Sequence, residues 1–440
     1  MMMRMKRLVF MCFVLVAFCF QLNAHIKDYV GQRELVTKWE IIHHKPYGNG
    51  YHGLLLELTS QKWQNIVLKH KLRLVVPEKN KNSNKKTLLI IGGTYKPDKE
   101  RNDKAERYGV DLVKKINAPV AMLYDVPYQP LFGGLTEDRL LAETFERYRK
   151  TKDENWPIIF PMVKSAVKAI DCLEVLLDEK FKIKQQGVVV TGPSKRGWTS
   201  WFMPVVDKRV LAIAPVVYDN LNIPKQLQYQ LDMWGSYSKS ISAYTNKNLP
   251  QKLKNKDPDL QKLVKMIDPY TYKEELKVPK LLVNGTNDSF WTLGAMRHYI
   301  DDLPGDTFLY YAPNAGHGLK EGRESTISTV ASFFRYIDGQ IDFPEIKASF
   351  QKNGARVKVR LRTEGDPWDV MLMRAVSDTN DFRKSKWVPL AMNEKGRFYE
   401  QRLNVPKGKS MALFCQVVYE SDGLEFLRSS RIHIISKNAK

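Results

Sequence analysis

The sequence between residues 87 and 337 repeats one pattern, in which a short continuous apolar run is followed by a turn and then by a segment with helical spacing. The apolar runs are TLLIIGG, APVAMLYD, GVVVTG, VLAIAPVV, PKLLVNG and DTFLYYA. Runs without polar alternation are typical of strands that are buried on both faces, as in parallel sheets. Strands that alternate with helices therefore predict an α/β fold with a mostly parallel sheet covered by helices on both faces.

Two further segments complete this domain. Residues 51–76 hold two apolar stretches that predict antiparallel strands added to the sheet. Residues 220–275 are rich in Gln, Tyr, Lys and Trp and carry no strand signal, so we expect a helical cap insertion there. The clearest amphipathic helix spans residues 158–180. We assign residues 25–340 to this α/β domain.

The pattern changes after about Gly339, where short alternating strands separated by turn residues replace the strand and helix alternation. Such strands predict a sandwich of about seven strands. We therefore expect residues 341–440 to form an all-β, immunoglobulin-like accessory domain.

The first 24 residues have the features of a secretory signal peptide. Arg4, Lys6 and Arg7 precede an apolar run over residues 8–20, and the small-residue sequence Leu-Asn-Ala ends the segment. The apolar run is short for a membrane span. We expect cleavage after residue 24 and a periplasmic or extracellular protein; an uncleaved N-terminal anchor is the alternative.

The remaining cysteines and the histidines do not predict a metal site. Cleavage leaves Cys172 and Cys415, both in apolar patterns that favour buried free thiols over a disulfide. The eight histidines are scattered, and neither H-E-x-x-H nor C-x-x-C occurs. We therefore expect no metal and no cofactor.

The chain is strongly basic. Its formal net charge is +22, and the three basic residues of the expected signal peptide leave +19 after cleavage. A basic exported protein suits anionic envelope surfaces or acidic polysaccharides, while a solvated lysine-rich surface is the simpler interpretation. No nucleic-acid-binding module is recognisable, so we expect no nucleic-acid partner.

Three chemically distinctive residues follow apolar strands in the order Ser194, Asp288, His317. This is the chain order of the catalytic triad in the α/β-hydrolase fold, where parallel strands bring their carboxyl ends to one edge. A serine hydroxyl needs a histidine to accept its proton, and the histidine needs a carboxylate to orient it. The turn reads G-P-S-K-R-G, one residue longer than the usual G-x-S-x-G nucleophile elbow.

An acid and a pair of oxyanion donors complete the hypothesis. Asp219 follows the strand before the cap and is the alternative to Asp288. The backbone N–H of Lys195, directly after the serine, is one expected oxyanion donor. The second comes from Gly93 or Thr94, after the TLLIIGG strand. The side chains of Lys195 and Arg196 either bind an anionic group or pair with carboxylates, and we expect pairing for Arg196.

Aromatic residues of the cap and its surroundings are candidates for a substrate pocket. We expect contributions from Trp198, Trp234 and Trp291, and also from Tyr229 and Tyr237. Aromatic side chains are more often packing residues, so packing is the alternative for each of them.

Five segments together resemble the PhoPQ-activated pathogenicity-related protein family: TGPSKRGWTSW, DKRVLAIAPVVYDNLN, IDPYTY, VPKLLVNGTNDSFW and LPGDTFLYYAPNAGHG. The resemblance covers about residues 28–435 and implies an exported α/β-hydrolase. Its pattern carries the same serine-turn spacing, with alanine where this chain has Pro193. The turn alone is also similar to that of glucuronoyl esterases, which have a basic residue after the serine.

We therefore expect a secreted serine hydrolase that cleaves an ester or an amide of a small molecule, a glycan or a peptide. A dipeptidyl-peptidase-like activity is one form of the peptide alternative. A non-catalytic binding protein on a hydrolase scaffold is the alternative from another class.

Overall fold

The structure is a computed structural model that describes residues 25–47, 50–77, 86–95 and 109–437. The expected signal peptide, residues 1–24, lies outside this part of the chain. Within the described part, no helix combines the length and the apolar character that crossing a bilayer requires.

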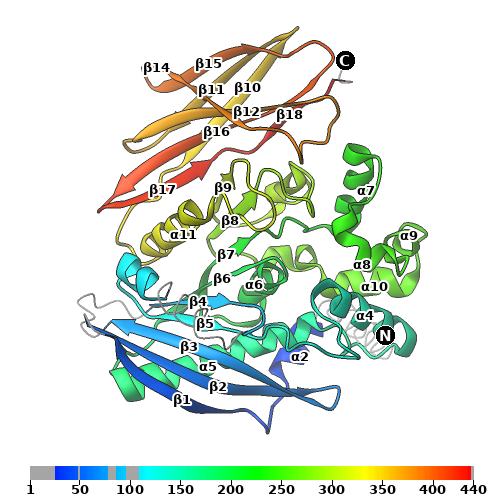
Figure 1. Ribbon diagram of the computed structural model, residues 1–440, viewed down its shortest axis with the longest axis vertical. Helices are drawn as coiled ribbons and strands as arrows, with labels where there is room; N and C mark the ends of the chain where they lie inside the picture. The colour runs from blue at the N-terminus through cyan, green and yellow to red at the C-terminus, as the bar shows by residue number, and fades with distance from the viewer. Residues whose placement is uncertain (1–24, 48–49, 78–85, 96–108, 438–440) are drawn as a thin grey trace, which may run out of the picture.

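A nine-stranded sheet forms the centre of the α/β domain, with the order β1-β2-β3-β5-β4-β6-β7-β8-β9 (Figure 1). The strands are β1 (Lys38–Tyr47), β2 (Tyr51–Trp63), β3 (Ile66–Pro77), β4 (Lys86–Ile91), β5 (Val120–Leu123), β6 (Gly187–Pro193), β7 (Val210–Val216), β8 (Lys280–Gly285) and β9 (Thr307–Ala312). The six strands from β4 to β9 are parallel to one another, and β1, β2 and β3 extend the sheet antiparallel. The predicted α/β fold is thus confirmed, with β1 as an additional strand.

Helices cover both faces of this sheet because alternate strand residues enter two separate cores. Val188 and Val190 of β6 join the core beneath α5 (Ile159–Phe181) and α6 (Lys195–Val206). Val189, which points the other way, joins the core beneath α11 (Arg323–Ile337). All three valines are fully buried, as expected for a central strand. The predicted helix over residues 158–180 corresponds to α5.

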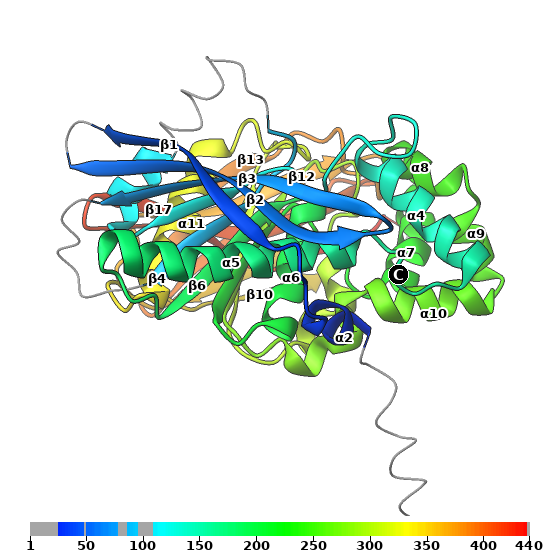
Figure 2. The same ribbon diagram turned by 90° about the horizontal axis from the view of Figure 1, so that it is seen from below.

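The predicted cap consists of helices gathered at one side of the molecule (Figures 1 and 2). Its elements are α7 (Ile223–Trp234), η1 (Lys239–Ile241), α8 (Ser242–Thr245), α9 (Leu249–Lys254), α10 (Pro258–Ile267) and η2 (Pro269–Glu275). A further helix, α4 (Glu137–Thr151), packs against α8 and α10. α4 therefore belongs spatially with the cap, although it precedes the cap by about 70 residues.

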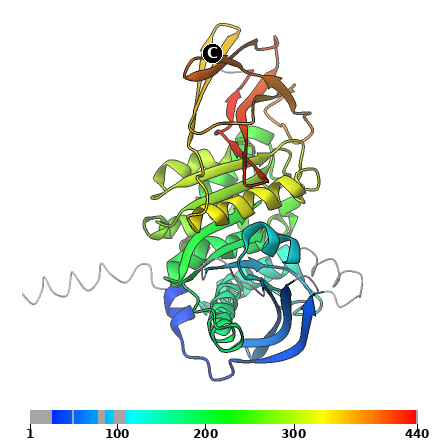
Figure 3. The same cartoon turned by 90° about the vertical axis from the view of Figure 1, so that its left-hand side faces the viewer.

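Two antiparallel sheets form the C-terminal domain, which lies at the opposite end of the molecule from β1 to β3 (Figure 3). One sheet contains β10 (Ile346–Asn353), β11 (Arg356–Thr363), β15 (Phe398–Asn404) and β14 (Asn393–Lys395). The other contains β13 (Val388–Ala391), β12 (Asp369–Ser377), β16 (Ser410–Ser421), β17 (Leu424–Ser429) and β18 (His433–Ile435). The described chain thus has more than the seven strands predicted there.

The two domains contact each other along β9, the last strand of the large sheet. The backbone N–H of Tyr311 in β9 donates to Ser429 Oγ of β17, and Gln416 Nε2 of β16 donates to the carbonyl of Tyr311. These bonds occupy backbone groups of an edge strand that would otherwise be unpaired. The sandwich therefore closes one edge of the α/β sheet.

Candidate active site

Ser194 lies on a sharp turn between β6 and α6. Its backbone has φ 57° and ψ −121°, a combination that a non-glycine residue rarely adopts. The Ser194 N–H donates to the carbonyl of Val216 at 2.8 Å, and its carbonyl accepts from Trp198 N–H at 3.0 Å. These bonds hold the strained turn at both ends and project the side chain from the sheet edge.

Glycines flank this turn because their neighbours leave no room for a side chain. A Cβ on Gly192 would lie 2.8 Å from Arg196 Cβ, and one on Gly197 would lie 3.0 Å from both Tyr218 Cβ and the Val216 carbonyl. The second glycine therefore packs against β7 and the segment that follows it. The extra residue between Ser194 and Gly197 is accommodated within the first turn of α6.

The structure brings Ser194, His317 and Asp288 together. Ser194 Oγ lies 2.9 Å from His317 Nε2, and His317 Nδ1 lies 2.7 Å from Asp288 Oδ2. The other carboxylate oxygen, Asp288 Oδ1, accepts from the Phe290 N–H at 2.7 Å. The Phe290 ring also packs on the imidazole, with centroids 4.2 Å apart. This geometry matches a serine, histidine and carboxylate relay.

Asp219 lies nearby but has other partners. It is buried, and it accepts hydrogen bonds from Tyr299 Oη at 2.6 Å and from Asn284 Nδ2 at 3.3 Å. Burial raises the pKa of Asp219 to about 7; the Tyr299 hydrogen bond opposes this shift and the charge of Asp288 adds to it. Among the described contacts, the carboxylate that reaches His317 is Asp288.

The expected oxyanion donors lie around the start of α6. Lys195 is the first residue of the helix, where backbone N–H groups have no partner within the helix. A Cβ on Gly93 would lie 2.9 Å from Arg196 Nη2, so the loop after β4 packs directly on this first turn. No hydrogen bond between described residues uses the N–H of Lys195, Gly93 or Thr94.

The side chains of Lys195 and Arg196 are buried and paired with the first residues of α4. Arg196 binds Glu137 through both terminal nitrogens, at 2.9 and 2.7 Å, which confirms the expected pairing. Lys195 Nζ lies 2.8 Å from Asp138 Oδ2 and 3.4 Å from Glu137. Burial alone would raise the pKa of Glu137, but hydrogen bonds and charge from Arg196, with smaller effects of Gln129 and Lys195, lower it to about 2.

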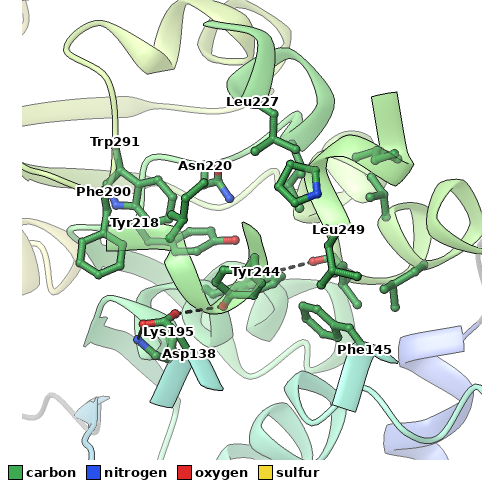
Figure 4. A pocket seen from close by; sticks show the side chains of 18 of the residues that line it. Asp138, Phe145, Lys195, Tyr218, Asn220, Leu227, Tyr244, Leu249, Phe290 and Trp291 are labelled. Carbon is green, nitrogen blue, oxygen red and sulfur yellow. Dashed lines mark hydrogen bonds and ion pairs between the residues drawn. The ribbon is translucent and has the colours of Figure 1, made fainter. Parts of the chain in front are cut away.

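A cavity of about 110 Å³ opens beside Ser194 and extends beneath the cap (Figure 4). Its lining residues are Asp138, Phe145, Ser194, Lys195, Trp198, Tyr218, Asn220, Ile223, Leu227, Gln230, Ile241, Tyr244, Leu249, Pro250, Leu253, Leu260, Leu263, Val264, Ile267, Phe290 and Trp291. Most of them are apolar and come from the cap helices, α4 and α6.

Some of the aromatic residues that were expected to form a substrate pocket line this cavity, and others lie outside it. Trp198 and Trp291 line the cavity. Trp234 is outside the lining, because it lies at the end of α7 with the Arg383 guanidinium 4.0 Å from its ring centre. Tyr229 and Tyr237 are also outside the lining, and Tyr229 packs against a histidine ring at a centroid distance of 4.8 Å. Of the three tryptophans, Trp198 and Trp291 therefore line this cavity and Trp234 does not.

The cavity also includes residues that the sequence analysis did not single out. The most important are Asp138 from α4, Tyr244 from the cap and Phe290 beside Asp288. Only Phe290 had a sequence signal, since it lies two residues after a candidate catalytic acid.

The described residues contain no group of three His, Cys, Asp or Glu side chains that could hold a metal ion. Cys172 and Cys415 are buried free thiols, as expected, and burial raises the pKa of each to about 12. Neither thiol is near the lining of the cavity described above.

Comparison with known structures agrees with this architecture. The acetyl xylan esterase 1 from Thermoanaerobacterium sp. JW/SL YS485 superposes with a TM-score of 0.50 over 72% of this chain and 94% of its own, at 16% sequence identity. At this identity the likeness is one of fold. The chain thus has an α/β-hydrolase fold with a C-terminal pair of antiparallel sheets.

Sequence comparison gives a closer relationship. The autocrine proliferation repressor protein A of Dictyostelium discoideum is 27% identical over 346 residues, which cover 76% of this chain and 68% of that protein. The family model described as PhoPQ-activated pathogenicity-related protein matches residues 26–383. The chain therefore belongs to the PhoPQ-activated pathogenicity-related protein family.

Proposed function

We propose that this protein is a serine hydrolase in which Ser194 is the nucleophile, His317 the general base and acid, and Asp288 the residue that orients His317. The observation that carries the proposal is the continuous relay of 2.9 Å from Ser194 Oγ to His317 Nε2 and 2.7 Å from His317 Nδ1 to Asp288. A histidine fixed on one side by a carboxylate and facing a serine on the other is arranged to accept the serine proton.

The reaction proceeds in two halves. Ser194 Oγ forms a bond to the substrate carbonyl carbon while its proton moves to His317 Nε2, and the carbonyl electron pair moves onto oxygen. The N–H groups of Lys195 and of Gly93 or Thr94 stabilise this oxyanion. When the intermediate collapses, the bond to the leaving alcohol or amine breaks, and that group takes the proton from His317.

Water completes the cycle. It attacks the acyl-enzyme carbonyl as His317 accepts its proton, and the bond to Ser194 then breaks while Ser194 Oγ regains a proton from His317. The products are a carboxylic acid and the restored enzyme. No step of this reaction requires a metal ion or another cofactor, and the proposal includes no cofactor.

The substrate is an ester or an amide carried by a small molecule, a glycan or a peptide. The fold likeness to an acetyl xylan esterase favours testing carbohydrate esters first. The proposal includes no nucleic-acid substrate or partner. We also retain the expectation that the protein acts in the periplasm or outside the cell.

The test compares hydrolysis of acyl esters, methyl glucuronoyl esters and aminoacyl arylamides by wild type and Ser194→Ala. We expect turnover of at least one class and a loss of about 10³-fold or more in kcat for the variant. Ser200→Ala is the matched control on the same helix, because its hydroxyl donates to the Arg196 carbonyl and has no other hydrogen-bond partner among the described residues.

Two results would reject the proposal. One is Ser194→Ala with wild-type turnover. The other is folded wild-type protein that hydrolyses none of the three classes, which would favour the binding-protein alternative.

A further inference from the structure

We propose that the cavity beside Ser194 binds an apolar group of the substrate, so that the preferred substrates carry an aliphatic or single-ring group of about four to six carbons and not only an acetyl group. The inference rests on the proposed serine hydrolase activity, and it names the substrate class of that site.

One apolar wall of the cavity consists of side chains from α4 and the cap. The side chains that form it are Phe145 of α4 and, from the cap, Leu227, Ile241, Leu249, Leu253, Leu260, Leu263, Val264 and Ile267. These residues come from five different elements that converge on one space (Figure 4). Binding an apolar group there removes it from water without burying a polar group, so burial itself favours the complex.

Two of the polar lining residues, Asp138 and Gln230, have protein partners, whereas Tyr218 Oη is buried without one among the described residues. Asp138 receives a hydrogen bond from Lys195 Nζ at 2.8 Å and another from Tyr244 Oη at 3.0 Å, so both of its oxygens are occupied. Gln230 donates to the Phe290 carbonyl and accepts from the Ser238 N–H. The charged side chains of the lining, Asp138 and Lys195, pair with each other, so a charged substrate group in this cavity would be desolvated without an unpaired opposite charge, which is costly. The cavity selects against carboxylates and ammonium groups.

The aromatic walls are fixed before a substrate arrives. Trp198 stacks on Tyr218 with centroids 5.2 Å apart, and its indole N–H donates to the Ile267 carbonyl at 2.7 Å. The Trp291 indole N–H donates to the Val217 carbonyl at 2.9 Å. A buried aromatic whose polar atom is bonded keeps one orientation, so the cavity is pre-formed and little ordering is needed on binding.

The size of the cavity sets the size of the group. Its volume is about 110 Å³. An apolar cavity of ~150 Å³ in another protein holds a benzene molecule. A butyl, hexyl or phenyl group attached to the scissile bond would therefore fill this space, whereas an acetyl methyl group would leave most of it empty.

The experiment measures kcat/KM for two series of esters. The first varies the acyl chain from acetate through butyrate and hexanoate to benzoate with a constant p-nitrophenol leaving group, and the second varies the alcohol of acetate esters from methyl to hexyl and benzyl. We expect one series to rise by roughly 4-fold per methylene, the fold-change that corresponds to ~0.8 kcal/mol per buried CH₂, until the cavity is full. Whichever series rises identifies whether the acyl or the alcohol side occupies the cavity.

Two variants fill the cavity from different helices. Leu227→Trp and Val264→Phe both add bulk at half-buried lining positions. We expect either substitution to remove the advantage of the longer chains, so that the ratio of kcat/KM for the longer ester to that for the acetate falls toward 1. Lys225→Trp, on the exposed side of the same helix as Leu227, is the matched control and should keep the wild-type profile.

The outcomes separate the inference from the proposed function. Turnover that is best with methyl acetate and p-nitrophenyl acetate, or a chain-length profile unchanged in both filling variants, would overturn the inference and leave the hydrolase proposal standing. Absence of turnover in both ester series, while aminoacyl arylamides or methyl glucuronoyl esters are hydrolysed, would also overturn the inference alone. Failure of all these substrate classes would overturn the hydrolase proposal, and the inference with it.

Discussion

Asp288 and Asp219 are two buried carboxylates with different partners. Asp288 lies 2.7 Å from His317 Nδ1, whereas Asp219 accepts from Tyr299 and Asn284. We expect Asp288→Asn to lower kcat by about 10³- to 10⁴-fold, because the amide no longer holds the required histidine tautomer. Asp219→Asn keeps an acceptor for Tyr299, and we expect less than about a 10-fold change. Steady-state kinetics of both variants test the assignment, and the reverse order of losses would make Asp219 the acid.

Asp219 also makes the stability of the folded protein depend on pH. The pKa of Asp219 is about 7 in the folded protein against 3.8 for an unperturbed aspartate, so between these values the folded state binds a proton that the unfolded state has released. Stability contributed by this group therefore falls as the pH rises from about 4 to above 7. We expect Asp219→Asn to gain stability relative to wild type over this range, measured by urea unfolding at pH 4 and pH 8. Parallel pH profiles for the two proteins would contradict the prediction.

A substitution at Gly93 tests whether the loop after β4 supplies an oxyanion donor. An added methyl group would meet the Arg196 guanidinium at 2.9 Å, and that guanidinium is held by Glu137. The loop must therefore move, and we expect Gly93→Ala to lower kcat by about 10- to 100-fold with little change in fold, as judged by circular dichroism. Gly31→Ala is the control, because no atom lies within 4 Å of its added Cβ. Equal activity of the two variants would remove Gly93 from the oxyanion site.

At the scale of elements, α4 supports the start of α6. Its first two residues, Glu137 and Asp138, bind the buried side chains of Arg196 and Lys195. Carboxylates at a helix N-terminus are favourable in themselves, and here they also neutralise two cations beside Ser194. α4 therefore connects the cap region to the strained turn.

Glu137→Gln tests this connection. We expect a loss of about 2 kcal/mol in the free energy of unfolding, below the ~3–5 kcal/mol of a fully buried pair because the Glu137 side chain is 40% exposed. The low pKa of Glu137, about 2 against an ordinary 4.5, means that its contribution is complete above pH 4.5 and is lost as the pH falls toward 2. The two proteins should therefore converge in stability at low pH. Glu143→Gln on the same helix should cost ~0–1 kcal/mol, because its partners Arg147 and Lys247 are 34% and 32% exposed, whereas Arg196 is 7% exposed. A loss equal to that of Glu137→Gln would contradict this expectation.

Sequence patterns predicted the elements that carry strong periodicity. The parallel sheet, the cap and the strand ends that carry Ser194, Asp288 and His317 followed from apolar runs and chain order. After β8, where the alternation of strands and helices places a helix, the chain instead forms two short 3₁₀ turns, η3 (Ala295–His298) and η4 (Ile300–Asp302). Gly294 has φ 80° and Tyr299 has φ −152°, so the chain cannot continue as one helix there.

Contacts between distant segments were beyond sequence reasoning. α4 has an apolar face with Leu140, Leu141, Phe145 and Tyr148 buried, which is a usable helical signal. However, nothing in the sequence indicates that Glu137 and Asp138 meet α6, because that contact depends on how the two helices pack. Packing between distant segments also explains why Trp234 lies outside the cavity lining. Its helix was expected, but its side chain faces Arg383 of the C-terminal domain.

For the whole molecule, the C-terminal domain contacts the loops that carry Asp288 and His317. Asn287 Nδ2 donates to the carbonyls of Arg383 and Ser385, at 3.1 and 2.8 Å. Asn314 exchanges two hydrogen bonds with the backbone of Trp387, at 3.0 and 2.8 Å. The family match ends at residue 383, within this contact segment. The C-terminal domain thus holds the loops that carry Asp288 and His317 through these hydrogen bonds.

The double variant Asn287→Ala with Asn314→Ala tests this bracing. We expect kcat to fall by about 10-fold with little change in KM, because small displacements of the acid and base loops affect chemistry more than binding. Asn404→Ala, at an exposed position of β15, is the control for a substitution in the C-terminal domain. A change in KM alone, or no change, would assign the contact to domain docking without a role in positioning.

Ser194 is proposed as a covalent nucleophile, and active-site labelling examines this role without a known substrate. Purified protein is treated with a fluorophosphonate and the modified peptide is identified by mass spectrometry. We expect a single adduct on the peptide that contains Ser194, strongly reduced in Asp288→Asn and absent in Ser194→Ala. Folded wild-type protein that stays unlabelled, or an adduct that persists in Ser194→Ala, would contradict the account.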